Sequence, residues 1–410
     1  MRIAAHTLGC KLNFAETSDL LRRLASEGNE IVDIGAGADM YIINTCTVTA
    51  AAEKKCRNAI RQAVAQAGGA EVVVTGCMGA TSRAAIESIP GVSAVYGNER
   101  KPLLAWSWSD GEQLSASDDA PGRRTRVFFK VQDGCDYFCT YCAIPLARGR
   151  SRSATVDETL RAARHIADVH DGGALEVVLT GVNTGTFGCR QGETLLDLMM
   201  GLDAIEGVSR YRISSIEPNL LTDAMVDFVA SSRAFLPHFH LPLQGGTDRL
   251  LNLMHRRYDT ALYRDKLLYI IQRMPDACIA ADVMAGFNGE DEAEFGRVLE
   301  YLESLPISYL HVFTYSDRPG TAALRLGDKV PIPVRHEHAA RLIALSHRKH
   351  DAFIDSQLGR TRPVLWETTN HDGFLQGWTD NYIRLQRHFD AALAGTLQDV
   401  EIAPDNIVTA

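Results

Sequence analysis

The stretch VFFKVQDGCDYFCTYC at residues 127–142 joins an apolar run, typical of a buried strand, to a loop with three cysteines. Cys135, Cys139 and Cys142 have CxxxCxxC spacing, and three thiolates on one short loop can bind three irons of a four-iron cluster. The fourth iron then has no protein ligand and can bind a small molecule. A structural zinc site needs four ligands, and no fourth cysteine or histidine lies close by in the sequence. The spacing therefore favours an iron-sulfur cluster over zinc.

Six strand and helix units follow one another in residues 125–330. The expected strands are VFFKVQ, EVVLTG, RYRISSI, FHLPLQ, ADVMAGF and YLHVFTY. Because a closed TIM barrel has eight such units, this count predicts a partial, open (βα)6 barrel. Residues at the carboxyl ends of barrel strands face the pocket. The polar residues expected there are Thr180, Asn183, Ser214, Glu217, Gln244 and Asp282.

A second group of cysteines lies in residues 1–104, where short apolar runs alternate with helix-like stretches and predict a small doubly wound α/β domain. Cys10, Cys46 and Cys77 each end an apolar run, in TLGC, NTC and TGC. The carboxyl ends of parallel strands meet at one edge of a sheet. We therefore expect these three thiols to converge on a second cluster, and we expect Cys56, Cys189 and Cys278, which lack this pattern, to be structural.

The rest of the chain divides into three further segments. Residues 105–124 have no periodicity and are rich in Ser, Asp and Gly, which predicts a linker. Residues 331–359 predict a connecting helix, whose histidines we expect on a solvated face: His336, His338, His347 and His350. Residues 360–410 contain short strand-like runs between turn residues and predict a small β-barrel module.

The amino terminus has neither a basic start nor a long apolar stretch, which favours a cytoplasmic protein. Nine cysteines are then better explained by metal binding or catalysis than by disulfides. A net charge of −9 argues against wrapping nucleic acid with the whole surface, but it permits a local basic groove. Basic islands occur at residues 122–126, 147–152 and 255–257.

One of these basic islands directly follows the cysteine loop. Arg148, Arg150 and Arg152 alternate along it, and in an extended segment their side chains would lie on one side. We expect them to contact substrate phosphates.

The cysteine loop and the six-unit barrel resemble the radical S-adenosylmethionine (SAM) superfamily. In that superfamily the amino and carboxylate groups of SAM bind the open iron, and reductive cleavage of SAM gives a radical. The resemblance places Tyr141 near the adenine of SAM, and some of the pocket residues named above around its methionine and ribose parts.

Further ordered motifs resemble the methylthiotransferase family: GCKLNFAET, NTCTVT, ARGRSRS, LTGVN, RISSIEP, HFHLPLQ and YSDRPGT. GCKLN and NTCTVT are most similar to the MtaB branch, which modifies N6-threonylcarbamoyladenosine beside the tRNA anticodon. The resemblance implies two [4Fe-4S] clusters, one on each cysteine triad, and methylthiolation of adenine C-2. It also implies tRNA as partner, an electron donor such as flavodoxin or ferredoxin, and an RNA-binding TRAM module at residues 360–410.

Two positions depart from the usual family motifs. Gly245 stands where the family has Ser, and Asn288 stands where the family has Pro. The alternatives are a methylthiotransferase acting on isopentenyladenosine of tRNA or on an aspartate of a ribosomal protein, and a non-catalytic zinc-binding RNA module.

Overall fold

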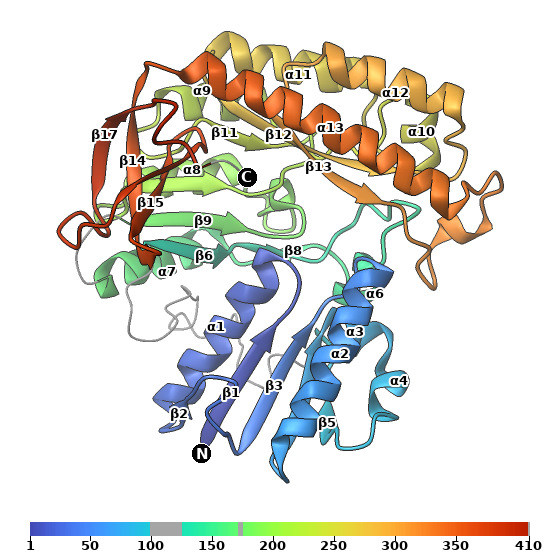
Figure 1. Cartoon of the computed structure of the whole chain (residues 1–410), viewed down its shortest axis with the longest axis vertical. Coiled ribbons are helices and arrows are strands. Elements are labelled where there is room, and N and C mark those ends of the chain that lie inside the picture. The colour runs from blue at the N-terminus through green and yellow to red at the C-terminus, as the bar shows by residue number, and fades with distance from the viewer. Residues whose placement is uncertain (99–124, 171–174, 409–410) are drawn as a thin grey trace.

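The N-terminal domain is a parallel sheet covered by helices (Figure 1). The computed structural model describes residues 1–98, 125–170 and 175–408, so the linker expected at 105–124 lies outside the described residues. The strands are β1 (Arg2–Thr7), β2 (Glu30–Ile31), β3 (Met40–Thr45), β4 (Glu71–Gly76) and β5 (Ala94–Val95), in the order β2-β1-β3-β4-β5. The strand order reverses between β1 and β3, and ligands bind at such switch points. The helices are α1 (Lys11–Ser26), α2 (Ala50–Ala67), α3 (Cys77–Thr81) and α4 (Arg83–Glu87).

The central domain is a half barrel of six parallel strands. These strands are β6 (Arg126–Lys130), β9 (Glu176–Thr180), β10 (Arg210–Ile213), β11 (His238–His240), β12 (Cys278–Ala285) and β13 (Tyr309–Thr314). They form two three-stranded sheets, β10-β9-β6 and β11-β12-β13. Two isolated parallel bridges, Tyr211 with Phe235 and Ser215 with His240, join the sheets next to β10 and β11. The expectation of a partial (βα)6 barrel is confirmed.

Helices cover the outer face of the half barrel: α7 (Val156–Val169), α8 (Leu195–Asp203), α9 (Asp223–Ser231), α10 (Asp248–Leu253), α11 (Thr260–Arg273) and α12 (Glu292–Ser304) (Figure 1). Alternate strand residues such as Val177, Leu179 and Ile279 point into the main hydrophobic core. Their neighbours along each strand face the lumen, because successive side chains of a strand point to opposite faces.

Short elements connect the half barrel to the cysteine loop. They are β7 (Gln132–Asp133), β8 (Arg152–Ser153) and α6 (Ile144–Arg148), with the 3-10 helices η2 (Thr184–Thr186) and η3 (Ala322–Arg325) farther along the chain. In Figure 1, α6 lies beside α3 of the N-terminal domain.

The long helix α13 (Ile332–Gln357) leads from the barrel to the C-terminal module. His336 and His347 are exposed as expected, but the expectation is wrong for His338. His338 Nδ1 lies 2.7 Å from Glu290 Oε1, and its ring stacks on Phe295 with centroids 3.7 Å apart. The side chain is therefore buried between α13 and the barrel.

The C-terminal module is an antiparallel sheet of β14 (Thr361–His371), β15 (Phe374–Thr379), β16 (Arg384–His388) and β17 (Leu397–Glu401), in the order β16-β15-β14-β17. The sheet curls around its own small core, which includes Trp366, Leu375 and Leu385. The module lies at the amino ends of the first barrel strands, far from the cysteine loop (Figure 1). Among the described residues no helix is long and apolar enough to cross a membrane.

Candidate active site

The loop with Cys135, Cys139 and Cys142 is held by its own backbone. The amide of Cys135 donates to the carbonyl of Gly149 (3.0 Å), and the amide of Cys142 donates to the carbonyl of Cys139 (3.0 Å). Gly134 has φ of 69°, and an added Cβ would lie 2.1 Å from the carbonyl oxygen of Arg150, so only glycine fits at this turn. The turn brings the three thiols together.

The three thiols interact electrostatically with one another, and all three cysteines are free of disulfides. Burial raises the pKa of Cys142 to about 12 and that of Cys135 to about 11. Thiols that are at least partly buried, form no disulfide and lie together on one loop are a suitable ligand set for a soft metal cluster.

Three polar side chains at the carboxyl ends of β9 and β10 have no hydrogen-bond partner in the described part of the chain. They are the hydroxyls of Thr180 and Ser214 and both amide atoms of Asn183. A buried polar atom without a partner costs free energy, so such atoms mark a place where a ligand supplies the missing bonds. These residues fit a polar cofactor next to the cysteine loop.

Arg256 connects the cysteine loop to the barrel mouth. Its guanidinium donates to Cys139 Sγ (3.2 Å) and to the Tyr141 hydroxyl (3.3 Å), and it pairs with Glu217. Tyr141 also packs edge-on against Phe287. Sequence reasoning placed Tyr141 and Glu217 at the mouth but named Arg256 only as part of the basic island at 255–257. It missed the buried contacts of this arginine, because they join different loops.

A pocket of about 190 Å³ opens beside the cysteine loop. Its lining includes Tyr141, Cys142, Gln244 and Asp282 from the barrel, and Val48 from the N-terminal domain. Gln244 has φ of 67°, and its backbone N–H donates to the backbone carbonyl of Asp282 (2.7 Å). The pocket therefore lies where the two domains meet.

The cysteines of the N-terminal domain lie at the carboxyl edge of its sheet. Cys10 occupies the N-cap position of α1 without a capping hydrogen bond, Cys46 follows β3, and Cys77 starts α3. Cys46 interacts electrostatically with Cys77 and Cys10, and burial raises its pKa to about 12. Gly9 has φ of 111°, and an added Cβ would lie 2.8 Å from the Cβ of Cys46, so the backbone before Cys10 passes directly against Cys46.

Cys56 lies next to this group but has a different role. Its sulfur accepts a hydrogen bond from the amide of Cys46 at 3.2 Å, and its thiol lies 3.5 Å from the Cys46 carbonyl. Cys56 is fully buried in the core of the domain. It supports the backbone of Cys46 from α2.

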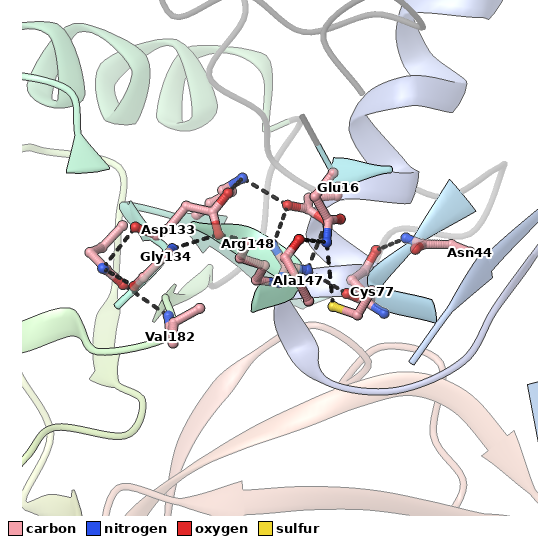
Figure 2. Close-up of polar contacts among 12 residues, drawn as sticks. Glu16, Asn44, Cys77, Asp133, Gly134, Ala147, Arg148 and Val182 are labelled. Carbon is pink, nitrogen blue, oxygen red and sulfur yellow. Dashed lines mark hydrogen bonds and ion pairs between the residues drawn. The ribbon is translucent and has the colours of Figure 1, made fainter. Parts of the chain in front are cut away.

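Figure 2 shows a buried polar network between the two domains. The Arg148 guanidinium donates to Asn13 Oδ1 (2.6 Å) and Glu16 Oε1 (2.8 Å) of α1 and to Asp133 Oδ1 (3.0 Å) of the barrel. Lys130 Nζ bonds to the same two carboxylates. Burial alone would raise the pKa of Asp133, but Lys130 and Arg148 lower it to about 2.

This network corrects one sequence prediction. The Arg148 side chain is only 1% exposed and both of its terminal nitrogens already donate to Asn13, Glu16 and Asp133, so it cannot contact a phosphate as we expected. The segment is not extended there either, because α6 ends at Arg148 and Gly149 has φ of 76°. Arg152 is partly exposed and bonds to Asp133, whereas Arg150 is 68% exposed and lies over the Phe138 ring.

A second link joins the two cysteine groups. The Asn98 amide donates to the carbonyl of Ala147 on α6 (2.8 Å) and lies 3.6 Å from Cys77 Sγ. On the barrel side, Ser316 Oγ accepts from the amide of Ala50 (3.1 Å), and Arg318 pairs with Glu53. The domain interface is therefore fixed close to both thiol groups.

The two departures from the family motifs have structural roles. The Asn288 amide donates to the carbonyl of Ala323 (2.9 Å), which ties its loop to η3. An added Cβ at Gly245 would lie 3.1 Å from the Cβ of Leu250, so the loop packs tightly against α10.

Sequence reasoning missed the polar lining of the barrel lumen. The missed residues are Lys11, Glu176, Arg210, Arg212, His240 and His311. The signal was present in the strand sequences, because RYRIS and HFHLP alternate polar with apolar residues. In a filled barrel the inward positions are bulky and apolar, so inward Arg and His indicate an open, polar lumen.

Comparisons with known proteins agree with this site. Residues 2–97 match the family described as Uncharacterized protein family UPF0004, and residues 129–302 match the Radical SAM superfamily. The protein named threonylcarbamoyladenosine tRNA methylthiotransferase MtaB of Bacillus subtilis is 35% identical over 98% of this chain and 93% of its own length. The tRNA-2-methylthio-N(6)-dimethylallyladenosine synthase of Clavibacter sepedonicus is 32% identical over 91% of this chain and 73% of its own.

The chain belongs to the radical SAM methylthiotransferase family, a family of enzymes with a [4Fe-4S] cluster that use SAM. Within that family it groups with relatives named MtaB, which also occur in Aquifex aeolicus and Thermotoga maritima. Among solved structures, the radical SAM methyltransferase TsrM from Kitasatospora setae has a TM-score of 0.55 at 13% identity, covering 76% of this chain and 72% of that one. At this identity the likeness shows the fold alone.

Proposed function

We propose that the enzyme adds a methylthio group to C-2 of N6-threonylcarbamoyladenosine next to the tRNA anticodon. The observation that carries this proposal is the pair of thiol groups held across one domain interface by the contacts of Arg148 and Asn98. One site would activate the substrate carbon and the other would supply the sulfur group. Both sites must therefore reach the same substrate atom. The names of the relatives supply the nucleoside.

In this proposal each thiol group has its own cluster. Cys135, Cys139 and Cys142 hold the [4Fe-4S] cluster that binds SAM, and a second [4Fe-4S] cluster is held by Cys10, Cys46 and Cys77. The clusters and SAM supply the radical and sulfur chemistry. The chain itself orients the ligands, fixes the spacing of the two sites and excludes water.

The proposed cofactor contacts come from the barrel mouth. The unpaired atoms of Thr180, Asn183 and Ser214 support a polar ligand, and Tyr141 supplies a flat face beside the cysteine loop. Gln244 and Asp282 line the same pocket, while Glu217 is placed by Arg256.

The proposed partners are the anticodon stem-loop of a tRNA and an electron donor such as flavodoxin or ferredoxin, in the cytoplasm. Arg150 and the exposed edge of Arg152 remain candidates for phosphate contact. The module of residues 360–410 is proposed to add to RNA binding. Extruding a poorly stacked loop adenosine costs little free energy.

The test is a turnover assay with anaerobically reconstituted enzyme, dithionite and SAM. We expect about eight irons per chain and methylthiolation of tRNA that carries threonylcarbamoyladenosine, detected by nucleoside mass spectrometry. The comparison substrates are tRNA with dimethylallyladenosine, which the Clavibacter relative's name indicates, and a ribosomal-protein peptide. Product only from either comparison substrate would overturn the substrate assignment. Stoichiometric zinc without visible absorbance would overturn the cluster assignment.

A further inference from the structure

Two histidines of the barrel lumen, His240 and His311, take no part in the proposed cofactor contacts and lie beside Asp282. One ring nitrogen from each of His240 and His311 and one carboxylate oxygen of Asp282 lie within 4.8 Å of one another. His240 Nε2 is 2.7 Å from Asp282 Oδ1, and the two imidazole rings have centroids 5.0 Å apart. His311 is the exposed member of the three, so it borders the open space of the lumen.

These three residues lie between two pockets. Asp282 lines the pocket of about 190 Å³ beside Cys142. His311 lines a second pocket of about 350 Å³, together with Tyr309 and with Tyr382 of the C-terminal module. A nucleoside with its base near the cysteine loop could therefore extend a substituent past Asp282 towards His311.

Positive charge exceeds negative charge around this space. Glu176 pairs with three arginines, at 3.4 Å, 3.2 Å and 3.1 Å, and one of the three also pairs with Glu367 at 3.3 Å. Lys11 of the N-terminal domain interacts electrostatically with Asp282 and also with His311. Three permanent cations, Arg126, Arg210 and Arg212, thus share two carboxylates through these ion pairs, and Lys11 is a further basic side chain.

This excess of positive charge bears on whether the site suits a divalent metal ion or an organic anion. Two imidazoles and a carboxylate are also a donor set for a divalent metal ion. However, the 2.7 Å contact between His240 and Asp282 is a direct hydrogen bond, and surrounding cations repel a dication. The observations therefore favour an organic anion over a metal ion.

We propose that His311 and Lys11 form a subsite for a carboxylate on the N6 substituent of the substrate adenosine, with Asp282 beside it to accept a hydrogen bond from a hydroxyl. This inference rests on the proposed function and deepens it. A threonylcarbamoyl group carries both a carboxylate and a hydroxyl, whereas a dimethylallyl group is a hydrocarbon. A hydrocarbon in this subsite would leave its polar groups unpaired, which is how a polar site rejects an apolar analogue.

The test measures binding, so it does not depend on turnover. Reconstituted enzyme without reductant is titrated with two anticodon stem-loop RNAs that differ only in the threonylcarbamoyl group on one adenosine. We expect the wild type to prefer the modified RNA. His311→Gln and Lys11→Gln should each reduce the ratio of the two affinities about tenfold, because each removes a bond to a charged group.

His336→Gln is the matched control, because this histidine is exposed on α13 and lies outside the lumen. It should keep the wild-type ratio of affinities. Iron content and thermal midpoint are measured for every variant, since Lys11 adjoins Cys10 and either substitution could disturb folding.

The outcomes separate this inference from the proposed function. If the wild type has no preference for the modified RNA and no turnover of it, the proposed function is wrong. If the wild type prefers the modified RNA and folded, iron-loaded His311→Gln and Lys11→Gln keep that preference, only the subsite is wrong. If His336→Gln also loses the preference for the modified RNA, the subsite is overturned as well.

Discussion

The two ends of the half barrel treat polar side chains in opposite ways. At the amino end, Glu176 is fully buried and pairs with three arginines. At the carboxyl end of the same strand, the Thr180 hydroxyl has no described partner, and neither does that of Ser214. The amino end uses its polar groups to join β6, β9 and β10 to each other and to the C-terminal module. The carboxyl end leaves polar groups unpaired, which lowers the stability of the ligand-free protein. A bound ligand restores that stability by supplying the missing hydrogen bonds.

The largest expected effect is at the carboxyl end. Cys135→Ala should abolish reductive cleavage of SAM, because the cluster proposed on this loop would lose a ligand. Cys77→Ala should retain most of that cleavage and lose methylthio transfer. The measurement is 5′-deoxyadenosine and methylthiolated nucleoside in one assay. Equal cleavage by both variants would contradict the division of roles between the two thiol groups.

At the amino end we expect a large effect on stability. Glu176→Gln should lower the free energy of unfolding by about 3–5 kcal/mol, because it leaves buried guanidinium groups without their carboxylate. Denaturant unfolding of the apoprotein measures this. Glu206→Gln, at an exposed position, is the control and should stay within about 0.5 kcal/mol of wild type. A small effect at Glu176 would remove the contrast between the two ends.

The same carboxylate predicts a pH dependence. Burial alone would raise the pKa of Glu176, but Arg212 and Arg126 lower it to about 2. Because the folded pKa is below the unfolded one, this group stabilises the fold above the ordinary glutamate pKa, and that stability is lost as the pH falls towards 2. Unfolding free energies of wild type and Glu176→Gln between pH 6 and pH 3 should therefore converge at the acid end. Parallel curves would contradict the prediction.

Returning to the carboxyl end, Thr180→Val and Ser214→Ala should weaken SAM binding by about fivefold to tenfold each, since each removes one hydrogen bond to a ligand. Their unfolding free energies without ligand should not fall, because the hydroxyls have no described partner in the protein. Equilibrium dialysis with reconstituted enzyme measures the affinity. Ser88→Ala, far from the barrel on α4's carboxyl end, is the control.

The smallest expected effect concerns RNA. Arg150→Ala should reduce the slope of log affinity for tRNA against log salt by about 1, because this exposed side chain would neutralise one phosphate. Arg22→Ala, on α1 away from the cysteine loop, should leave the slope unchanged. An unchanged slope for Arg150→Ala would remove this residue from the RNA interface.

The two thiol groups could be predicted from the sequence by different arguments. The spacing of Cys135, Cys139 and Cys142 is local, so the loop could be recognised without any fold. The grouping of Cys10, Cys46 and Cys77 needed the additional argument that parallel strands end at one edge. The first argument uses local spacing and the second uses the topology of a parallel sheet. Both can be read from a sequence pattern.

Contacts between distant elements were beyond that reasoning. The burial of Arg148 depends on Asn13 and Glu16 of another domain, and the burial of His338 depends on Glu290 and Phe295 of the barrel. A basic run near a cluster predicts phosphate binding only if its side chains are exposed. Charge pairing across an interface cannot be inferred from the spacing of charges along the chain.

The buried network of Arg148 has a consequence for the catalytic cycle. Parting the two domains would strip this guanidinium of Asn13 and Glu16 on α1, and it would leave the Glu16 carboxylate without Arg148 and Lys130. Such a separation is expensive for buried charges, so the distance between the two thiol groups stays constant from one step to the next. The two domains then hold the two thiol groups at a fixed spacing. Exchange of spent cofactor and release of RNA must occur by motion of the ligands and surface loops, and the two halves of the active centre stay assembled throughout.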